Sequence, residues 1–155
     1  MRRPFGADQL HPLADTGENV EYHVGRLIDH VHLRVSDLEA SKRFYRAVLE
    51  SIDLAAALVE GADYFHADEL FVDEAREAVS RVHLAFQAPD RATVHKFHAA
   101  ALAAGGRDNG GPGERGYHPC YYAAFVLDPD GNNIEAIYHG PAARSASSIV
   151  VTPAD

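Results

Sequence analysis

The chain contains very little cysteine, with a single residue, Cys120, among 155. One cysteine excludes a disulfide within the chain and is typical of proteins in a reducing compartment, so we expect a cytoplasmic location. The thiol has two interpretations, a small buried side chain or a nucleophile. The first is favoured, because free cysteines are among the most often buried residues.

Positive charge is also scarce, since 14 Lys and Arg stand against 23 Asp and Glu and the formal net charge is −9. A nucleic-acid surface needs clustered positive charge. The composition therefore excludes a nucleic-acid partner and leaves small molecules and other proteins.

Long apolar runs are missing as well. No segment approaches the roughly 18 consecutive apolar residues of a transmembrane helix, so we expect no membrane partner. Residues 1–10 include two arginines but no apolar stretch behind them, which argues against a signal peptide. With 155 residues, 46% of them hydrophobic, the chain is predicted to form one globular domain.

What the chain has in excess is histidine, with ten residues. Two of them, His30 and His32, lie in the segment LIDHVHLRV (27–35), which has the alternation of a strand. Side chains alternate across a strand, so both imidazoles are expected on one face and the apolar residues between them on the other.

A strand and a helix occur twice in the chain. In the first copy a helix is predicted after the strand, with Ser36 as its N-cap and Glu39 completing a capping box. In the second copy residues 81–87 alternate like a strand, and a helix follows between Pro89 and Gly105. An offset of 53 residues aligns the two copies, matching His30 with His83, Asp37 with Asp90, Phe44 with Phe97 and Leu49 with Leu102. An offset of 51, which matches His32 with His83, loses the Asp and Phe matches, so the repeat selects His30 as the counterpart of His83.

Short strand-like runs follow each helix. They lie at about 52–59, 62–66 and 69–73 in the first copy and at about 106–109, 120–127 and 132–138 in the second. DPDG (128–131) predicts a tight turn between the last two. The chain is therefore predicted to be an α+β protein of two tandem β-α-β-β-β modules, with a mixed sheet and helices on its outer face. The modules span about 26–75 and 80–140, between an N-terminal arm (1–25) and a C-terminal tail (141–155).

An acidic residue, Glu135, stands between Ile134 and Ala136 on the last predicted strand. A carboxylate among apolar neighbours needs a partner, because burying it unpaired is costly. Two imidazoles and a carboxylate, here His30, His83 and Glu135, suit a divalent transition metal such as Fe, Mn, Ni, Co or Zn. The alternative is two hydrogen-bonded strand histidines and a surface glutamate.

Three segments together resemble one protein group. LIDHVHLRVSDLEASKRFYRAVLE, RVHLAFQAPDRATVHKFHAAALAAGG and YYAAFVLDPDGNNIEAIYH are similar to the glyoxalase / bleomycin-resistance / extradiol-dioxygenase group, the vicinal oxygen chelate superfamily, over about residues 26–140. The resemblance implies two modules that form a cupped sheet around one divalent metal ion, with His30, His83 and Glu135 as ligands. Some members add a fourth ligand from the last strand of the first module. Glu69 is the nearest match to that ligand, and His66 and Asp73 match less well.

The resemblance also implies an activity. The expected protein is a small metalloenzyme that chelates two neighbouring oxygens of a small-molecule substrate and stabilises an enolate- or alkoxide-like intermediate, as a lyase or isomerase. Glu135 or Glu69 is the expected base. The alternatives are a metal-free protein that binds a small molecule or antibiotic and an iron(II) extradiol-type dioxygenase. The resemblance favours a homodimer.

The glycine-rich segment 105–119 lies between a predicted helix and a predicted strand, and we expect it to be a mobile rim over the cleft. Arg115, His118 and Tyr121 are predicted to contact the substrate from this rim. His32 is expected to line the same cleft beside His30.

Overall fold

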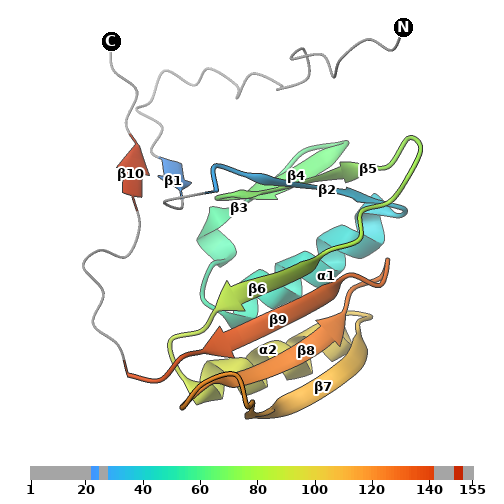
Figure 1. The fold of residues 1–155 in the computed structure, drawn as a ribbon. Helices are drawn as coiled ribbons and strands as arrows, with labels where there is room; N and C mark the ends of the chain where they lie inside the picture. Colours follow the sequence, from blue (N-terminus) through green and yellow to red (C-terminus); the bar gives the residue numbers. More distant parts are fainter. Residues whose placement is uncertain (1–21, 25–27, 142–148, 152–155) are drawn as a thin grey trace, which may run out of the picture.

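The computed structural model describes residues 22–24, 28–141 and 149–151. Two β-α-β-β-β modules follow one another in this part of the chain (Figure 1). The first comprises β2 (Val31–Val35), α1 (Leu38–Ser51), β3 (Leu58–Glu60), β4 (Tyr64–Ala67) and β5 (Leu70–Glu74). The second comprises β6 (His83–Gln87), α2 (Arg91–Ala103), β7 (Arg107–Glu114), β8 (Tyr122–Leu127) and β9 (Asn133–Tyr138).

Each module has its own four-stranded mixed sheet, in the order β2-β5-β4-β3 and β6-β9-β8-β7. In both sheets the first strand pairs in parallel with the last, and the other neighbours are antiparallel. The predicted α+β class and the repeated module are thereby confirmed. β2 and β6 each lie at an edge of their sheet.

The predicted arm and tail each contribute a short strand that the sequence does not signal. β1 (Tyr22–Val24) and β10 (Ile149–Val151) pair antiparallel as a separate two-stranded sheet. The rest of the predicted arm and tail, residues 1–21, 25, 142–148 and 152–155, lies outside the described residues. No helix of the described part is long and apolar enough to cross a membrane.

The helices cover the apolar faces of the sheets, and Figure 1 shows α1 running between the two sheets. Leu33 and Val35 on β2 are fully buried, as strand alternation predicts, and they share one core with the apolar stripes of both helices. The stripes that bury their side chains completely are Phe44, Tyr45 and Val48 on α1 and Val94, Phe97 and Ala101 on α2. The opposite faces of the sheets are left for polar side chains.

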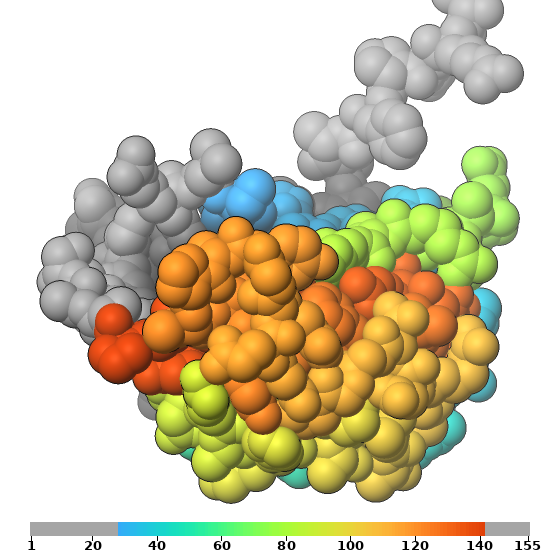
Figure 2. All heavy atoms as spheres, turned by 60° about the horizontal axis from the view of Figure 1, so that its bottom comes forward, coloured from blue at the N-terminus to red at the C-terminus, as the bar shows by residue number. Residues whose placement is uncertain are grey.

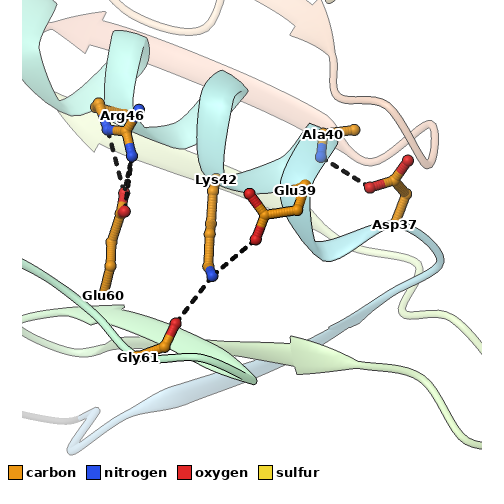
Figure 3. Close-up of polar contacts among 7 residues, drawn as sticks. All are labelled: Asp37, Glu39, Ala40, Lys42, Arg46, Glu60 and Gly61. Atoms are coloured by element: carbon orange, nitrogen blue, oxygen red, sulfur yellow. Dashed lines mark hydrogen bonds and ion pairs between the residues drawn. The ribbon is translucent and has the colours of Figure 1, made fainter.

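The start of α1 differs from the sequence prediction. Asp37, not Ser36, is the N-cap, and its carboxylate accepts a hydrogen bond from the Ala40 amide at 2.9 Å (Figure 3). Asp90 caps α2 in the same way through Thr93. Ser36 has a different partner, because its amide and hydroxyl both donate to the carboxylate of Asp130 in the second module.

Two polar contacts fasten α1 to the strands beneath it (Figure 3). The buried ammonium group of Lys42 donates to Glu39 and to the carbonyl of Gly61, both at 2.9 Å. One turn further on, Arg46 forms a two-pronged ion pair with Glu60 on β3. A buried ammonium is tolerated only when it is paired in this way.

Two predicted segments differ in part from the structure. Residues 52–57, expected in a strand, form the turn that follows α1 and a 3-10 turn (Ala55–Ala57), and β3 begins only at Leu58. The strand expected at about 106–109 is present but longer: β7 (Arg107–Glu114) extends into the segment expected to be a rim, and its pairing with β8 is interrupted by register shifts. The glycines allow this irregular edge, and only residues 115–121 remain as a loop between strands.

The predicted DPDG turn is present and is organised by the side chain of Asp128, which is 1% exposed. Its Oδ1 accepts from the amides of Asp130 and Asn132, and its Oδ2 accepts from the Asn132 side chain and from the hydroxyl of Tyr45 on α1. Gly131 has a φ of +87°, which glycine adopts without strain. Burial, followed by the neighbouring Asp128, raises the pKa of Tyr45 well above its usual range, so the phenol stays a donor.

We predict that Tyr45→Phe lowers the free energy of unfolding by about 1–3 kcal/mol, because a buried carboxylate then loses a donor that water cannot replace. Urea unfolding of the variant and the wild type measures the difference. Tyr117→Phe is the matched control, since Tyr117 is 73% exposed. Equal losses in the two variants would contradict the role given to the Tyr45 hydroxyl.

Candidate functional site

The face of the second sheet that lies away from the helices, called the outer face from here on, brings His83 and Glu135 together. β6 and β9 are parallel, with His83 opposite Asn133 and Glu135 two residues further along β9. The Nε2 atom of His83 lies 2.8 Å from Oε2 of Glu135. Because Leu84 and Ile134 pack into the core, the alternation of the two strands sends both polar side chains to the face away from the helices.

Glu135 is buried, with 2% of its side chain exposed, whereas His83 is 54% exposed. The second carboxylate oxygen, Oε1, accepts a hydrogen bond of 2.6 Å from the hydroxyl of Tyr121. An ionised carboxylate only accepts hydrogen bonds, so His83 donates Nε2–H to Oε2. Both oxygens of Glu135 therefore have a protein donor.

Tyr121 ends the loop between β7 and β8. Burial, then the hydrogen bond and the charge of Glu135, raises the pKa of Tyr121 to about 12. The phenol is accordingly neutral over the physiological range and remains a donor to Glu135. The predicted contact of Tyr121 with a substrate stays a prediction, and its contact with Glu135 is a role that the sequence gives no sign of.

The other two residues predicted on the rim also have protein partners. Arg115 donates to the carbonyls of Gly111 at 2.5 Å and Ala123 at 3.2 Å, and its guanidinium lies 5.2 Å from the centre of the Phe125 ring. Arg115 thereby fastens the loop to the sheet. His118 lies 2.9 Å from His139, between Nε2 and Nδ1.

Figure 2 shows the orange segment that follows β7 standing out from the surface, beside the red segment that follows β9. Cys120 belongs to this loop and is exposed. The expectation of a buried thiol is therefore wrong, and the reason is that the loop lies outside the core.

The structure does not bring His30 to His83 and Glu135. His30 lies one residue before β2, is exposed, and contacts Asp29 at 2.7 Å. In Figure 1, β2 begins at the left of the upper sheet and β6 at the right of the lower one. Among residues 22–24, 28–141 and 149–151, no three His, Cys, Asp or Glu side chains are grouped closely enough to hold a metal ion.

His32 belongs to a second histidine–carboxylate pair on the first sheet. Its Nε2 atom lies 2.9 Å from Oδ1 of Asp73 on β5, and both side chains are about one-third exposed. His32 is opposite Phe71, and Asp73 is two residues further along, which repeats the register of His83, Asn133 and Glu135. The internal repeat has therefore produced one such pair in each module.

Glu69, the nearest sequence match for a fourth ligand, lies in the turn before β5 rather than on the strand. Its carbonyl accepts a hydrogen bond from the Val31 amide at 2.6 Å. Asp73 has the register of Glu135 instead. The burial of Leu70 and Val72 is the signal that distinguishes them, since it fixes Phe71 and Asp73 on the outer face of a strand that begins at Leu70.

Comparisons with known proteins find one family. The model of the Glyoxalase/Bleomycin resistance protein/Dioxygenase superfamily matches residues 27–136. No curated protein matches the chain.

The solved structures similar to this chain include the following three. A glyoxalase/bleomycin resistance protein from Albidiferax ferrireducens T118 is 30% identical, with 71% of this chain and 97% of that chain covered and a TM-score of 0.61. A glyoxalase-related enzyme from Fulvimarina pelagi is 21% identical over 84% of this chain and 100% of that chain, with a TM-score of 0.63. A lactoylglutathione lyase from Agrobacterium tumefaciens is 22% identical, with 73% of this chain and 93% of that chain covered and a TM-score of 0.53. The last two show the fold alone.

We predict that Glu135→Gln lowers the pKa of Tyr121 part of the way from about 12 toward the ordinary value of 10.0. The substitution removes the charge of Glu135 and weakens the hydrogen bond, while burial, the largest cause, remains. Because the pKa of Tyr121 is raised, the contribution of its contact with Glu135 to the stability of the folded protein is present below about pH 10. That contribution is lost as the pH rises toward 12.

The ring-carbon chemical shift of Tyr121 measured by NMR against pH reports this change. Glu114→Gln is the matched control, because Glu114 pairs with Arg91 of α2 and is not among the causes of the Tyr121 shift. An unchanged titration of Tyr121 in Glu135→Gln would contradict the bond between them.

Proposed function

The chain belongs to the Glyoxalase/Bleomycin resistance protein/Dioxygenase superfamily, and from this we propose that it is a metalloenzyme of the lyase or isomerase type. It acts on a small molecule with two neighbouring oxygens. The observation that carries the proposal is the pair formed by His83 and Glu135 on the outer face of the second sheet, 2.8 Å apart.

The pair fits a divalent metal ion. Two adjacent ligands with metal–ligand bonds of about 2.1 Å lie roughly 3 Å apart, which is close to the separation of Nε2 and Oε2. A metal-bound imidazole and carboxylate are commonly held by outer partners. Tyr121 supplies such a partner, because its hydroxyl binds Oε1 and leaves Oε2 facing His83.

Among the residues that the structure describes, no third His, Cys, Asp or Glu joins this pair closely enough to complete a metal site. We propose that His30 of a second copy supplies the third ligand in a homodimer. Two features support this: His30 is exposed, and β2 and β6 are edge strands of their sheets. A two-fold pair of chains repeats every contact, so such a dimer has two equivalent sites.

His83 and Glu135 would hold a divalent ion, one of Fe, Mn, Ni, Co or Zn, which would supply Lewis-acid chemistry toward the two substrate oxygens. Tyr121 keeps the carboxylate of Glu135 in place. Glu135 or Glu69 is the base proposed from the sequence. Arg115 borders the site in the same chain. His32 of the second copy faces the site from the other side, and both residues contact the substrate in this proposal.

A metal-free protein that binds a small molecule or an antibiotic is the second candidate. One observation favours it: His83 and Tyr121 already satisfy both oxygens of Glu135 without a metal. An iron(II) dioxygenase uses the same ligands, and uptake of O₂ with a catechol and iron(II) distinguishes it from a lyase.

We predict that His83→Gln and Glu135→Gln each weaken metal binding by at least about 100-fold, beyond the 10- to 100-fold loss typical of outer partners. Titration of metal-free protein with Co(II), followed by its visible absorption and by calorimetry, measures the affinity. His98→Gln and Glu114→Gln are matched controls on the helix α2 and the strand β7, and they should bind like the wild type. Wild-type protein that takes up no divalent metal would refute the metalloenzyme and favour the binding protein.

We further predict that His30→Gln and Glu135→Gln, each deficient in metal binding alone, restore sites when the two variants are unfolded and refolded together. A mixed dimer has one site with His30, His83 and Glu135 all intact. With random pairing half of the dimers are mixed, so about a quarter of the sites return. Metal content per chain measures the recovery, and no recovery in a confirmed dimer would contradict a site shared between copies.

A further inference from the structure

His118 and His139 form a hydrogen-bonded pair next to the candidate site. His118 comes from the loop before β8, and His139 directly follows β9. Both rings meet the ring of Tyr121 edge to face, with centroids 5.1 Å and 5.3 Å away. Tyr121 in turn binds Glu135, so the pair lies one residue away from the proposed metal ligand.

The hydrogen bonds fix which nitrogen of each ring carries the proton. Nδ1 of His118 lies 2.8 Å from the carbonyl oxygen of Pro119, and a carbonyl can only accept. His118 therefore has its proton on Nδ1, and in the neutral ring its Nε2 is an acceptor. The partner of that acceptor, at 2.9 Å, is Nδ1 of His139, which must be the donor.

One consequence follows for His139. With its proton on Nδ1, the neutral ring has a free electron pair on Nε2. His139 is exposed, and within the described part of the chain its Nε2 forms no hydrogen bond. A base oriented by a second group in this way is the arrangement by which proteins prepare an imidazole for proton transfer.

Glu135 has no oxygen without a hydrogen-bond donor, since His83 donates to one of its carboxylate oxygens and Tyr121 to the other. We propose that His139 is the base of the site and that His118 is its positioning residue. This inference rests on the proposed function and narrows the substrate to a compound with a C–H bond next to a carbonyl and a neighbouring hydroxyl.

The step is balanced within the site. The C–H bond breaks, its electron pair remains on the substrate as an enolate, and the proton forms an N–H bond at Nε2 of His139. The imidazolium is stabilised because His139 still donates to His118, which donates to the carbonyl of Pro119. Return of that proton to the former carbonyl carbon, with the hydroxyl proton passing to the former carbonyl oxygen, completes an isomerisation and needs no oxidant.

The first experiment determines the tautomers. Long-range proton–nitrogen NMR spectra of metal-free protein with labelled histidine, taken at about pH 9 where imidazoles are neutral, report the protonated nitrogen of each ring. We expect Nδ1–H for both His118 and His139. His118→Phe removes the acceptor and should shift His139 to Nε2–H, whereas His118→Gln keeps an acceptor and should preserve Nδ1–H. His95→Gln is the control, because His95 binds Tyr122 on the other side of the sheet.

The second experiment tests the base. Protein loaded with Zn(II) is incubated with hydroxyacetone in D₂O, and NMR measures the exchange of the hydrogens next to the carbonyl. His139→Gln should lower the exchange rate by roughly 100-fold or more at unchanged zinc content, because general-base catalysis contributes about that much. His118→Phe should lower it less, and His118→Gln should recover part of the loss.

The outcomes separate the inference from the proposed function. Nε2–H on His139 in the wild type, or wild-type exchange rates in His139→Gln, would overturn the base. Zinc-loaded wild type that does not exchange the probe would overturn the base alone and leave the metal site intact. Protein that takes up no metal would overturn the proposed function and the base together.

Discussion

The buried carboxylate of Asp128 is the constraint on which the rest of the structure depends. It holds the turn before β9 by accepting hydrogen bonds from the amides of Asp130 and Asn132. It also accepts a hydrogen bond from the hydroxyl of Tyr45 on α1, in the first module. Asn132, fixed by Asp128, accepts from the Val82 amide just before β6. The register of β6 against β9 follows from this contact, and that register sets His83 beside Glu135. One carboxylate thereby joins the two modules and aligns the candidate site.

The internal repeat explains why the chain has two histidine–carboxylate pairs with different properties. In both sheets the carboxylate stands two residues beyond the strand partner of the histidine. In the second module the carboxylate is buried and has a second donor, Tyr121. In the first module His32 and Asp73 are both about one-third exposed, so the carboxylate of Asp73 is more open to water than that of Glu135. The repeat gives two similar pairs, and the loop before β8 adds a second donor, Tyr121, to one of them.

The sequence predicts those parts of the molecule that depend on local pattern. The alternation of 31–35, the apolar stripes of both helices and the DPDG turn have direct local causes, and all three are found. The errors arise where a distant partner decides. Ser36 has the chemistry of an N-cap, but Asp130 from the second module engages it and Asp37 caps the helix instead. The strand expected at about 106–109 continues to Glu114 because β8 lies beside it. The two ways of aligning the repeat also differ: the helices match His30 with His83, whereas the strand register gives His32 the position of His83.

The protons of the site would be coupled to the proposed metal binding. In the described chain the Nε2–H of His83 and the hydroxyl of Tyr121 satisfy Glu135. A metal ion would need the electron pair of Nε2, so His83 would have to release the proton that it donates, while Tyr121 could keep its bond to Oε1. Under the proposal, metal binding is therefore accompanied by the release of a proton. His30 does not contact His83 or Glu135 within one chain. If His30 contributes to metal binding, the site is shared between two copies of the chain. If it does not, His83 and Glu135 serve only as a hydrogen-bonded pair.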